Sequence, residues 1–276
     1  MRRPRSAGRR ALGRAASGSV WAIRAGALAL LFVPILLVIV MSFAGDAFNS
    51  LPPSTYSMRW YANVFAREEF VSGFFTSLAV AAIATPVSVA SGTLAAYALW
   101  KHPLPGARAL ETVLMSPILL PLVVTGLALL VFFNRVPLGS GIVNIALAHV
   151  IITLPYSFRA VLAALARYDR QLDEAAASLR VRPLDAFVHV TLPVIRPGLF
   201  AGALFSFVMS FDDFAATIFL ITPGTRTLPI AIYQYMEFNL DPTVSAVSAM
   251  LVFCAVITVI AVERVLGMDR FVGLRA

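Results

Sequence analysis

Long apolar runs recur along the chain and dominate its pattern. Six of them are long enough to cross about 30 Å of hydrocarbon as helices. They cover residues 25–43, 72–99, 110–133, 141–164, 198–221 and 243–266. Polar and charged residues gather between these runs and at both ends of the chain. The pattern therefore predicts an all-α integral membrane protein with six transmembrane helices.

The composition agrees with a membrane protein and narrows the chemistry. Charged residues make up only 13% of the 276 residues, whereas soluble domains carry about 25% to cover their surface. The single cysteine, Cys254, excludes an internal disulfide and a thiolate metal cluster within this sequence. The only lysine, Lys101, follows Trp100 rather than a glycine, so the sequence contains no Gly-Lys-Ser/Thr loop for ATP phosphates.

Basic residues are distributed unevenly between the two sides of the predicted spans. Eighteen of the 22 lysines and arginines lie on the side of the N-terminus, which predicts that both termini are cytoplasmic. Seven of them fall in residues 1–24, which we interpret as a disordered basic tail near anionic lipid rather than as a nucleic-acid-binding segment. The run that follows is too long for a usual signal peptide and is predicted to be an uncleaved span.

Residues 165–197 form an unusual connection between two predicted spans. Asp173-Glu174, followed by three alanines, predicts the acidic first turn of a helix. Pro183 predicts a break or a new first turn, and Pro193 and Pro197-Gly198 are expected to stop the amphipathic stretch that follows. A short helix that presents apolar residues outside the membrane needs a partner to cover them.

This segment resembles the EAA loop of ATP-binding-cassette importer permeases. Glu174-Ala175-Ala176, Leu179, Leu192-Pro193 and Pro197-Gly198 follow the pattern of that loop at its spacing. Arg180 departs from it, because the family has a glycine there, at the turn between two short helices. Further similar segments are Ser57-Met58-Arg59-Trp60-Tyr61, His149 to Tyr156, Ser210-Phe211-Asp212-Asp213-Phe214, Phe219-Leu220, Pro223-Gly224 and Thr227-Leu228-Pro229. The last four resemble the spermidine/putrescine subgroup in particular.

The resemblance implies a type I importer permease, a transport subunit rather than an enzyme, in the inner cell membrane. The implied substrate is a small solute, most like a polyamine, with ferric ion, thiamine or an amino acid derivative as alternatives. The implied partners are a separate ATP-binding subunit, a second homologous permease in a heterodimer and an extracytoplasmic substrate-binding protein. The chain itself is expected to bind no cofactor, because the partner subunit uses the ATP.

The resemblance also divides the chain into functional segments. It implies a cytoplasmic tail over 1–24, a first span with its outer loop over 25–71, a core transmembrane domain over 72–266 and a cytoplasmic tail over 267–276. Substrate would be delivered to the outer loops 44–71 and 222–242, and the ATPase would receive residues 174–190. The implied ATPase-coupling residues are Glu174, Ala175, Ala176, Leu179, Arg180, Leu184, Phe187, Leu192 and Pro193.

Asp212 and Asp213 are candidates for the substrate pathway. They fall within the predicted span over 198–221, roughly 20 Å along a helix from its start. A carboxylate there costs about 2.5–3.5 kcal/mol on insertion scales, and a cationic substrate would supply the complementary charge. Neighbouring positions differ by about 100° around a helix, so one of the two is expected to face the pathway. The alternatives are a helix cap and pairing with Arg226.

Other polar residues give weaker signals. Phe211 is a further candidate for the substrate pathway. Tyr233, Tyr235 and Glu237 could line a substrate entrance in the outer loop or form a re-entrant aromatic belt. The three histidines, His102, His149 and His189, lack the spacing of metal ligands and are interpreted as interfacial or packed. Gly126, Gly139 and Gly141 are predicted to permit close packing and a turn. The rival hypothesis is a stand-alone membrane enzyme, such as a lipid-linked transferase. Such an enzyme would need clustered acids or histidines, and in this sequence these residues are scattered.

Overall fold

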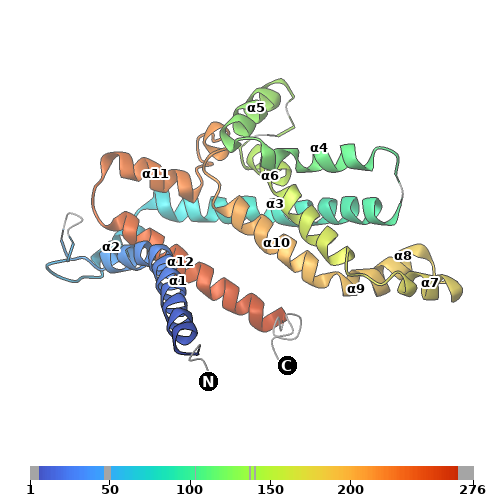
Figure 1. Ribbon diagram of the computed structural model, residues 1–276. Coiled ribbons are helices and arrows are strands. Elements are labelled where there is room, and N and C mark those ends of the chain that lie inside the picture. The colour runs from blue at the N-terminus through green and yellow to red at the C-terminus, as the bar shows by residue number, and fades with distance from the viewer. Residues whose placement is uncertain (1–5, 47–50, 103, 137, 140, 267–276) are drawn as a thin grey trace, which may run out of the picture. The chain divides into compact units, whose positions relative to one another are not determined.

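The computed structural model describes residues 6–266 apart from 47–50, 103, 137 and 140. The described part is helical and contains no β-strand, only an isolated antiparallel bridge. Four helices are apolar and long enough to cross a bilayer, and up to six spans result if two sharply bent helix pairs each count as one. The predicted all-α membrane fold is therefore confirmed (Figure 1). The chain divides into two compact units, which are described separately.

The smaller unit contains α1 (Ser6–Ser42), α2 (Arg59–Ala66) and α12 (Thr243–Leu266), with α1 and α2 both packed on α12. Because α1 begins at Ser6, the prediction of a disordered N-terminal tail is wrong for most of that segment. Its many alanines and arginines are strong helix formers, which extend the first span toward the N-terminus. The first five residues and the predicted C-terminal tail, 267–276, lie outside the described residues.

Side chains of α2 tie the smaller unit together. The indole Nε1 of Trp60 donates to the carbonyl oxygen of Ala44 at 2.6 Å. The amide of Asn63 donates to the hydroxyl of Thr243 at 2.8 Å, where α12 begins. Since polar groups are costly to leave unpaired at a membrane boundary, these two bonds fix α2 against both neighbouring segments.

Three long helices form the core of the larger unit: α3 (Glu68–Lys101), α6 (Ile142–Leu165) and α10 (Arg196–Phe211). Glycines let their backbones approach each other closely. A Cβ atom on Gly92 of α3 would lie 2.8 Å from the nitrogen of Phe158, and one on Gly202 of α10 would lie 3.0 Å from the Cα of Ser157. Small residues serve this purpose where the hydrophobic effect cannot drive helices together.

Buried hydroxyl groups also link these three helices. Ser157 on α6 lies 2.7 Å from Ser206 on α10 and 3.5 Å from Ser88 on α3, measured between hydroxyl oxygens. Ser206 in turn donates to the carbonyl oxygen of Thr153 at 3.3 Å. In hydrocarbon such groups must find partners within the protein, so they specify how the helices face each other.

Two apolar clusters complete the core, one toward each end of the helices. The first contains Val80, Phe133, Ile145, Ala146, Ala148 and Leu220. The second contains Ala96, Phe158, Val161, Leu165 and Ile195. The second cluster includes the residue at which the chain enters α10, so the packing of the core extends to the connection before that helix.

The predicted span over 110–133 is wrong as a single straight helix. The structure has α4 (Ala107–Leu119) and α5 (Leu122–Arg135), which meet at an angle of 105°. The break lies at Leu120, which is extended with φ −91° and ψ 142°, and at Pro121. A proline disfavours helical backbone in the residue before it and lacks the N–H that would continue the helix.

The predicted span over 198–221 is likewise wrong beyond residue 211. After α10 ends at Phe211, the chain continues through a 3₁₀ turn, η2 (Thr217–Phe219). A further helix, α11 (Leu228–Phe238), occupies most of the segment predicted as the outer loop 222–242. The larger unit therefore has three continuous core helices and two regions where the chain turns sharply.

The predicted roles of three glycines are confirmed. A Cβ on Gly126 would lie 2.6 Å from the Cα of Ala216, and one on Gly139 would lie 2.6 Å from the side chain of Val143. Gly141 has a φ of +55° in the turn before α6, a backbone conformation that other residues adopt at a cost.

Replacing Gly92 by valine should destabilise the core. The added Cβ meets the backbone of Phe158, so α3 and α6 must separate, at a cost of about 1–3 kcal/mol. The matched control is Gly26→Val, because no atom lies within 4 Å of a Cβ at Gly26 of α1. Thermal unfolding of the purified protein in mild detergent measures both variants. A midpoint for the Gly92 variant equal to that of the control would contradict the close approach.

Candidate functional site

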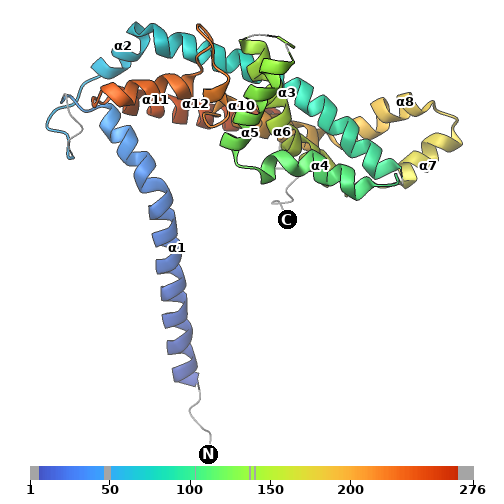
Figure 2. The same ribbon diagram turned by 90° about the horizontal axis from the view of Figure 1, so that it is seen from above.

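The segment between α6 and α10 folds as a helical hairpin beside one end of α3 (Figure 2). Its first arm is α7 (Gln171–Ser178), with Asp173 and Glu174 in the first turn. Its second arm begins with α8 (Pro183–Ala186) and continues through η1 (Phe187–Thr191) and α9 (Leu192–Val194). The predicted acidic helix start and the new helix at Pro183 are confirmed. We call residues 171–194 the hairpin.

Arg180 makes the turn between the two arms. Its φ is +54°, the only positive value among the described residues other than glycine. The N–H of Arg180 donates to the carbonyl of Ala177 at 2.9 Å, and the N–H of Val181 donates to that of Ala176 at 3.1 Å. These two bonds form a Schellman motif, in which the left-handed position is usually glycine. An arginine there keeps the turn but bears a steric cost of roughly 1–2 kcal/mol.

The second arm ends at Val194, between Pro193 and Pro197, as predicted. The helix continues one residue past Pro193, and the chain then bends by 72° at Ile195 into α10. Just before the proline, the N–H of Leu192 reaches back five residues to the carbonyl of Phe187, a π-helical turn. Such a wider turn accommodates the proline ring and its missing N–H. Leu192 itself packs on the apolar cluster at the start of α10.

The hairpin has an inner and an outer face. Ala176 and Ala186 are buried where the two arms meet the rest of the unit. On the outer face, Leu179 and Leu184 are 78% and 71% exposed, and Glu174 and Ala175 are exposed beside them. These two largely exposed leucines form an apolar surface beside a carboxylate. Exposed apolar surfaces of this kind often bind a protein partner.

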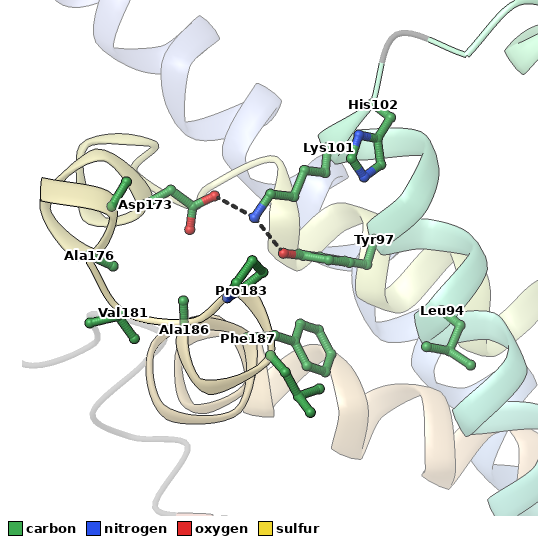
Figure 3. Close-up of a pocket in the computed structure, with 12 residues that line it drawn as sticks. Leu94, Tyr97, Lys101, His102, Asp173, Ala176, Val181, Pro183, Ala186 and Phe187 are labelled. Carbon is green, nitrogen blue, oxygen red and sulfur yellow. Dashed lines mark hydrogen bonds and ion pairs between the residues drawn. The ribbon is translucent and has the colours of Figure 1, made fainter. Parts of the chain in front are cut away.

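The inner face of the hairpin rests on the end of α3 (Figure 3). The ammonium of Lys101 lies 3.3 Å from the carboxylate of Asp173 and donates to the hydroxyl of Tyr97 at 2.7 Å. Tyr97 also packs on Phe187, with ring centroids 4.7 Å apart. Between these contacts lies an apolar groove of about 560 Å³. Burial and the hydrogen bond to Asp173 raise the pKa of Tyr168, in the connection after α6.

The other candidate site lies where α10 ends. Asp213 is 7% exposed and its carboxylate caps the following turn. It accepts hydrogen bonds from the N–H of Ala216 at 3.3 Å, the N–H of Thr217 at 2.9 Å and the hydroxyl of Thr217 at 2.7 Å. The structure thus realises the helix-cap alternative at Asp213. The same bonds explain why α10 stops, because aspartate competes with a helix by bonding the local backbone.

His149 of α6 completes this buried polar cluster. Its Nδ1 lies 2.8 Å from the hydroxyl of Ser210, its Nε2 lies 2.8 Å from that of Thr217, and Nε2 is 3.7 Å from Asp213. The imidazole is 1% exposed, so the prediction of a packed histidine is confirmed for His149. No three metal-binding side chains converge anywhere in the described ranges.

Asp212 differs sharply from its neighbour. It is exposed, and among the described residues no ion pair involves its carboxylate. The preceding Phe211 packs edge-on against Phe74 of α3, at 5.7 Å between centroids, and stacks on Phe207 at 5.9 Å. Among the described residues, the carboxylate of Asp212 therefore has no ionic partner, and the residue before it is packed between Phe74 and Phe207.

The two tyrosines of α11 lie in different surroundings. Tyr235 is buried against Phe70, and the guanidinium of Arg67 lies 4.7 Å from its ring centroid. Tyr233 is 44% exposed and packs on Phe214 at 4.9 Å. The hydrogen bond to Glu237, and the charge of that residue, raise the pKa of Tyr233. Of the two tyrosines, Tyr233 is thus the exposed one and the one that contacts Phe214.

The structure brings the predicted residues together in two places rather than one. The residues from Glu174 to Pro193 share the hairpin, and Phe211, Asp212 and Asp213 share the end of α10. The sequence did not point to Lys101 or His149 as parts of these sites. The available signal for Lys101 was that it is the only lysine in the sequence and directly follows Trp100. His149 begins a segment that resembles the family, but the sequence did not show its role, because its partners lie more than 60 residues away.

Residues 60–266 match a protein family described as the binding-protein-dependent transport system inner membrane component. Among similar proteins, the putrescine transport system permease protein PotI of Escherichia coli K12 is 29% identical over 228 residues, covering 80% of this chain and 81% of that protein. The spermidine/putrescine transport system permease protein PotC of the same strain is 26% identical over 245 residues, covering 89% and 92%.

Two further similarities extend the comparison. PhnV of Salmonella paratyphi A, which is named for 2-aminoethylphosphonate transport, is 29% identical over 255 residues, covering 92% of this chain and 95% of that protein. The crystal structure of a bacterial ABC transporter involved in the import of the polysaccharide alginate contains a similar chain. The TM-score is 0.66 at 16% identity, with 97% of this chain and 98% of that chain covered. At that identity the likeness concerns the fold alone.

The two aspartates should differ in their effect on stability. Asp213→Ala leaves the backbone N–H groups of Ala216 and Thr217 without their acceptor in a buried place, and the Thr217 hydroxyl keeps only His149 as a partner. This should cost about 2–3 kcal/mol. Asp212→Ala removes an exposed carboxylate without a partner and should leave the unfolding midpoint nearly unchanged. Thermal unfolding in detergent compares the two variants. Equal midpoints for both would contradict the capping role of Asp213.

Arg180→Gly should stabilise the turn of the hairpin, because glycine adopts the left-handed conformation without the steric cost. A gain of about 1 kcal/mol corresponds to roughly fivefold slower cleavage by thermolysin through local opening. Arg182→Gly is the matched control, since Arg182 has ordinary extended backbone with φ −61° and ψ 143°. That variant should be cleaved at least as fast as the unmodified protein. Slower cleavage of both variants alike would refute the strain at Arg180.

Proposed function

From the membership of this chain in the family of binding-protein-dependent transport system inner membrane components, we propose that it forms the translocation pathway of an importer for polyamines such as putrescine or spermidine. The chain is the permease component of an ATP-binding-cassette importer. Its own task is to provide the pathway and to receive the force of ATP hydrolysis. The observation that carries the substrate proposal is the exposed, unpartnered carboxylate of Asp212.

The energy comes from a separate ATP-binding subunit, since this sequence holds no Gly-Lys-Ser/Thr loop. The outer face of the hairpin is the surface that this subunit receives. Leu179 and Leu184 are almost fully presented there, and burying two leucine side chains supplies several kcal/mol of the binding energy at about 1.5–3 kcal/mol each. Glu174 beside them adds a charge that selects the docking register.

In the orientation that we propose, the hairpin lies in the cytoplasm. Lysine and arginine are concentrated on the side of both termini and the hairpin, as expected for the cytoplasmic side of an inner-membrane protein. The segments 44–71 and 222–242 then face outward and receive the substrate from an extracytoplasmic binding protein. A second, homologous permease completes the pathway in a heterodimer.

Asp212 gives a cation a temporary counter-charge along that pathway. An exposed carboxylate attracts a polyamine, and the aromatic rings near it, Phe211 and Phe214, offer cation–π contacts. A single carboxylate binds weakly enough to release the substrate again. Asp213 does not share this role, because it is buried and its Oδ2 already accepts three hydrogen bonds from Ala216 and Thr217.

The relatives support polyamines as the substrate class, and one of them points to the strongest alternative substrate. Two of them are named for putrescine or spermidine transport. A relative of equal identity is named for 2-aminoethylphosphonate, which carries an amine together with a phosphonate. Both classes share an ammonium group for which Asp212 is complementary, so the uptake experiment must compare them directly.

Deletion of the gene in the source cells should abolish uptake of labelled putrescine or spermidine, and the intact gene should restore it. Asp212→Asn should raise the half-saturation concentration about tenfold, as expected for the loss of roughly 1.4 kcal/mol of charge interaction. Glu111→Gln, a partly exposed acid on α4 that pairs with Arg159, is the control and should transport normally.

Unlabelled 2-aminoethylphosphonate is the competitor in the same assay. Competition stronger than that of unlabelled putrescine would replace the polyamine by the phosphonate as substrate. Uptake of polyamines that survives deletion of the gene would refute the polyamine proposal. An unchanged half-saturation concentration in Asp212→Asn would refute the role of this carboxylate.

A further inference from the structure

The end of α3 holds the hairpin through a compact group of polar contacts (Figure 3). Lys101, the last residue of α3, lies between the carboxylate of Asp173 and the hydroxyl of Tyr97. The second carboxylate oxygen of Asp173 accepts a hydrogen bond from Tyr168 at 2.8 Å. The side chains of Lys101 and Asp173 are only 31% and 22% exposed. The pair is thus shielded more than a surface ion pair, which contributes little.

Aromatic rings on the same end of α3 contact both arms of the hairpin region. Tyr97 packs on Phe187 of the second arm. Trp100 packs edge-on against Tyr168 at 5.2 Å, and its carbonyl oxygen accepts a hydrogen bond from Arg170 at 3.2 Å, directly before the first arm. We call Tyr97, Trp100 and Lys101 the α3 anchor. Through it, a displacement of either arm acts on the same turn of α3.

The other end of α3 lies at the second candidate site. Phe74 in its second turn packs against Phe211, the residue before Asp212. From Phe74 to Lys101 are 27 residues, or roughly 40 Å of helix. The helix continues through Pro86 without a break and packs along α6. A single helix thus connects the hairpin with the support of Asp212.

We propose that the Lys101–Asp173 ion pair transmits the movement of the hairpin to α3 and thereby to the end of α10. This inference rests on the proposed function, because the hairpin moves only if an ATPase engages it. Lys101 and Asp173 are positioning residues: they touch neither substrate nor nucleotide. The ion pair and its two tyrosine hydrogen bonds keep the hairpin and α3 in register. Without them, ring packing and the hydrogen bond from Arg170 to the carbonyl oxygen of Trp100 remain, but no charge pair ties the first arm to α3.

Charge reversal and its repair test the pair. Lys101→Asp and Asp173→Lys should each lower uptake per ATP hydrolysed by about fivefold or more in vesicles containing the complete transporter. The double variant restores an ion pair of opposite polarity and should regain uptake per ATP to within about twofold of the original. A merely structural role would lower the amount of assembled complex instead. Complex content is therefore measured in every sample.

The matched control is the ion pair between Glu111 and Arg159, 3.5 Å apart and 42% and 61% exposed. It joins α4 to α6 and does not contact the hairpin. Glu111→Arg should leave uptake per ATP unchanged. The proposal is overturned if the Lys101 and Asp173 single variants behave like this control. It is also overturned if the double variant remains as poor as the singles.

Chemical labelling detects the contact between Lys101 and Asp173 without a transport assay. Lys101 is the only lysine of the chain, so an amine-reactive ester followed by mass spectrometry reports on one side chain. Asp173→Asn should raise the labelling rate of Lys101 about threefold or more, because the lysine loses its ionic partner. In the complete transporter, the rate should also differ between nucleotide-free and ATP-bound states.

The labelling of Lys101 and the uptake of polyamines test the ion-pair inference and the substrate proposal separately. Equal labelling with and without the Asp173 carboxylate would show that the contact does not form. Equal labelling in both nucleotide states would show that the contact does not respond to the ATPase, and either result overturns the inference. If the charge-reversed variants fail to assemble, Lys101→Met replaces them and should still lower uptake per ATP. Absence of polyamine uptake by the unmodified transporter would refute the substrate proposal and leave the labelling result standing.

Discussion

The close approach of α3, α6 and α10 is the contact on which the rest of the larger unit depends. Lipid does not push apolar helices together, so their association relies on packing and on internal hydrogen bonds. Gly92 and Gly202 remove the side chains that would separate the backbones, and Ser157 bonds to Ser206 between them. These contacts lie within the helices, and the two candidate sites lie at the helix ends.

Those ends are occupied by two kinds of polar structure. At one end of α10, Asp213, His149 and Thr217 satisfy each other in a buried cluster. Asp212 is not part of this cluster. At the opposite end of the core, the hairpin leaves α6 and returns to α10 through the bend at Ile195. The hairpin is therefore joined directly to the helix that ends before Asp212, and it also contacts α3.

The hairpin itself combines a strained turn with a firm base. Arg180 holds a left-handed conformation that glycine would adopt more easily. Lys101 and Asp173 hold the base of the same hairpin through a shielded ion pair. The outward leucines, Leu179 and Leu184, lie on either side of Arg180 in the chain. The surface proposed for the ATPase thus includes the turn of the hairpin, although the residue at that turn departs from the family pattern.

Much of this organisation could be predicted from the sequence. The apolar runs determine that the chain is an all-α membrane protein, since a span requires a minimum length of apolar residues. The acidic start of α7 and the new helix at Pro183 follow from local effects, namely the helix dipole and the fixed φ of proline. The family pattern from Glu174 to Pro193 located the hairpin. The helix through Pro193 was not predictable, because a π-helical turn there absorbs the proline.

Tertiary contacts decided what the sequence left open. Two neighbouring aspartates look alike in a sequence, and only the fold of residues 216 and 217 onto Asp213 separates a structural carboxylate from a free one. His149 and Lys101 acquired their roles from partners more than 60 residues away. The sequence by itself determined the local helices and their membrane character, because these depend on neighbouring residues. The tertiary structure decided which polar groups are paired, because pairing depends on residues that meet only when the chain has folded.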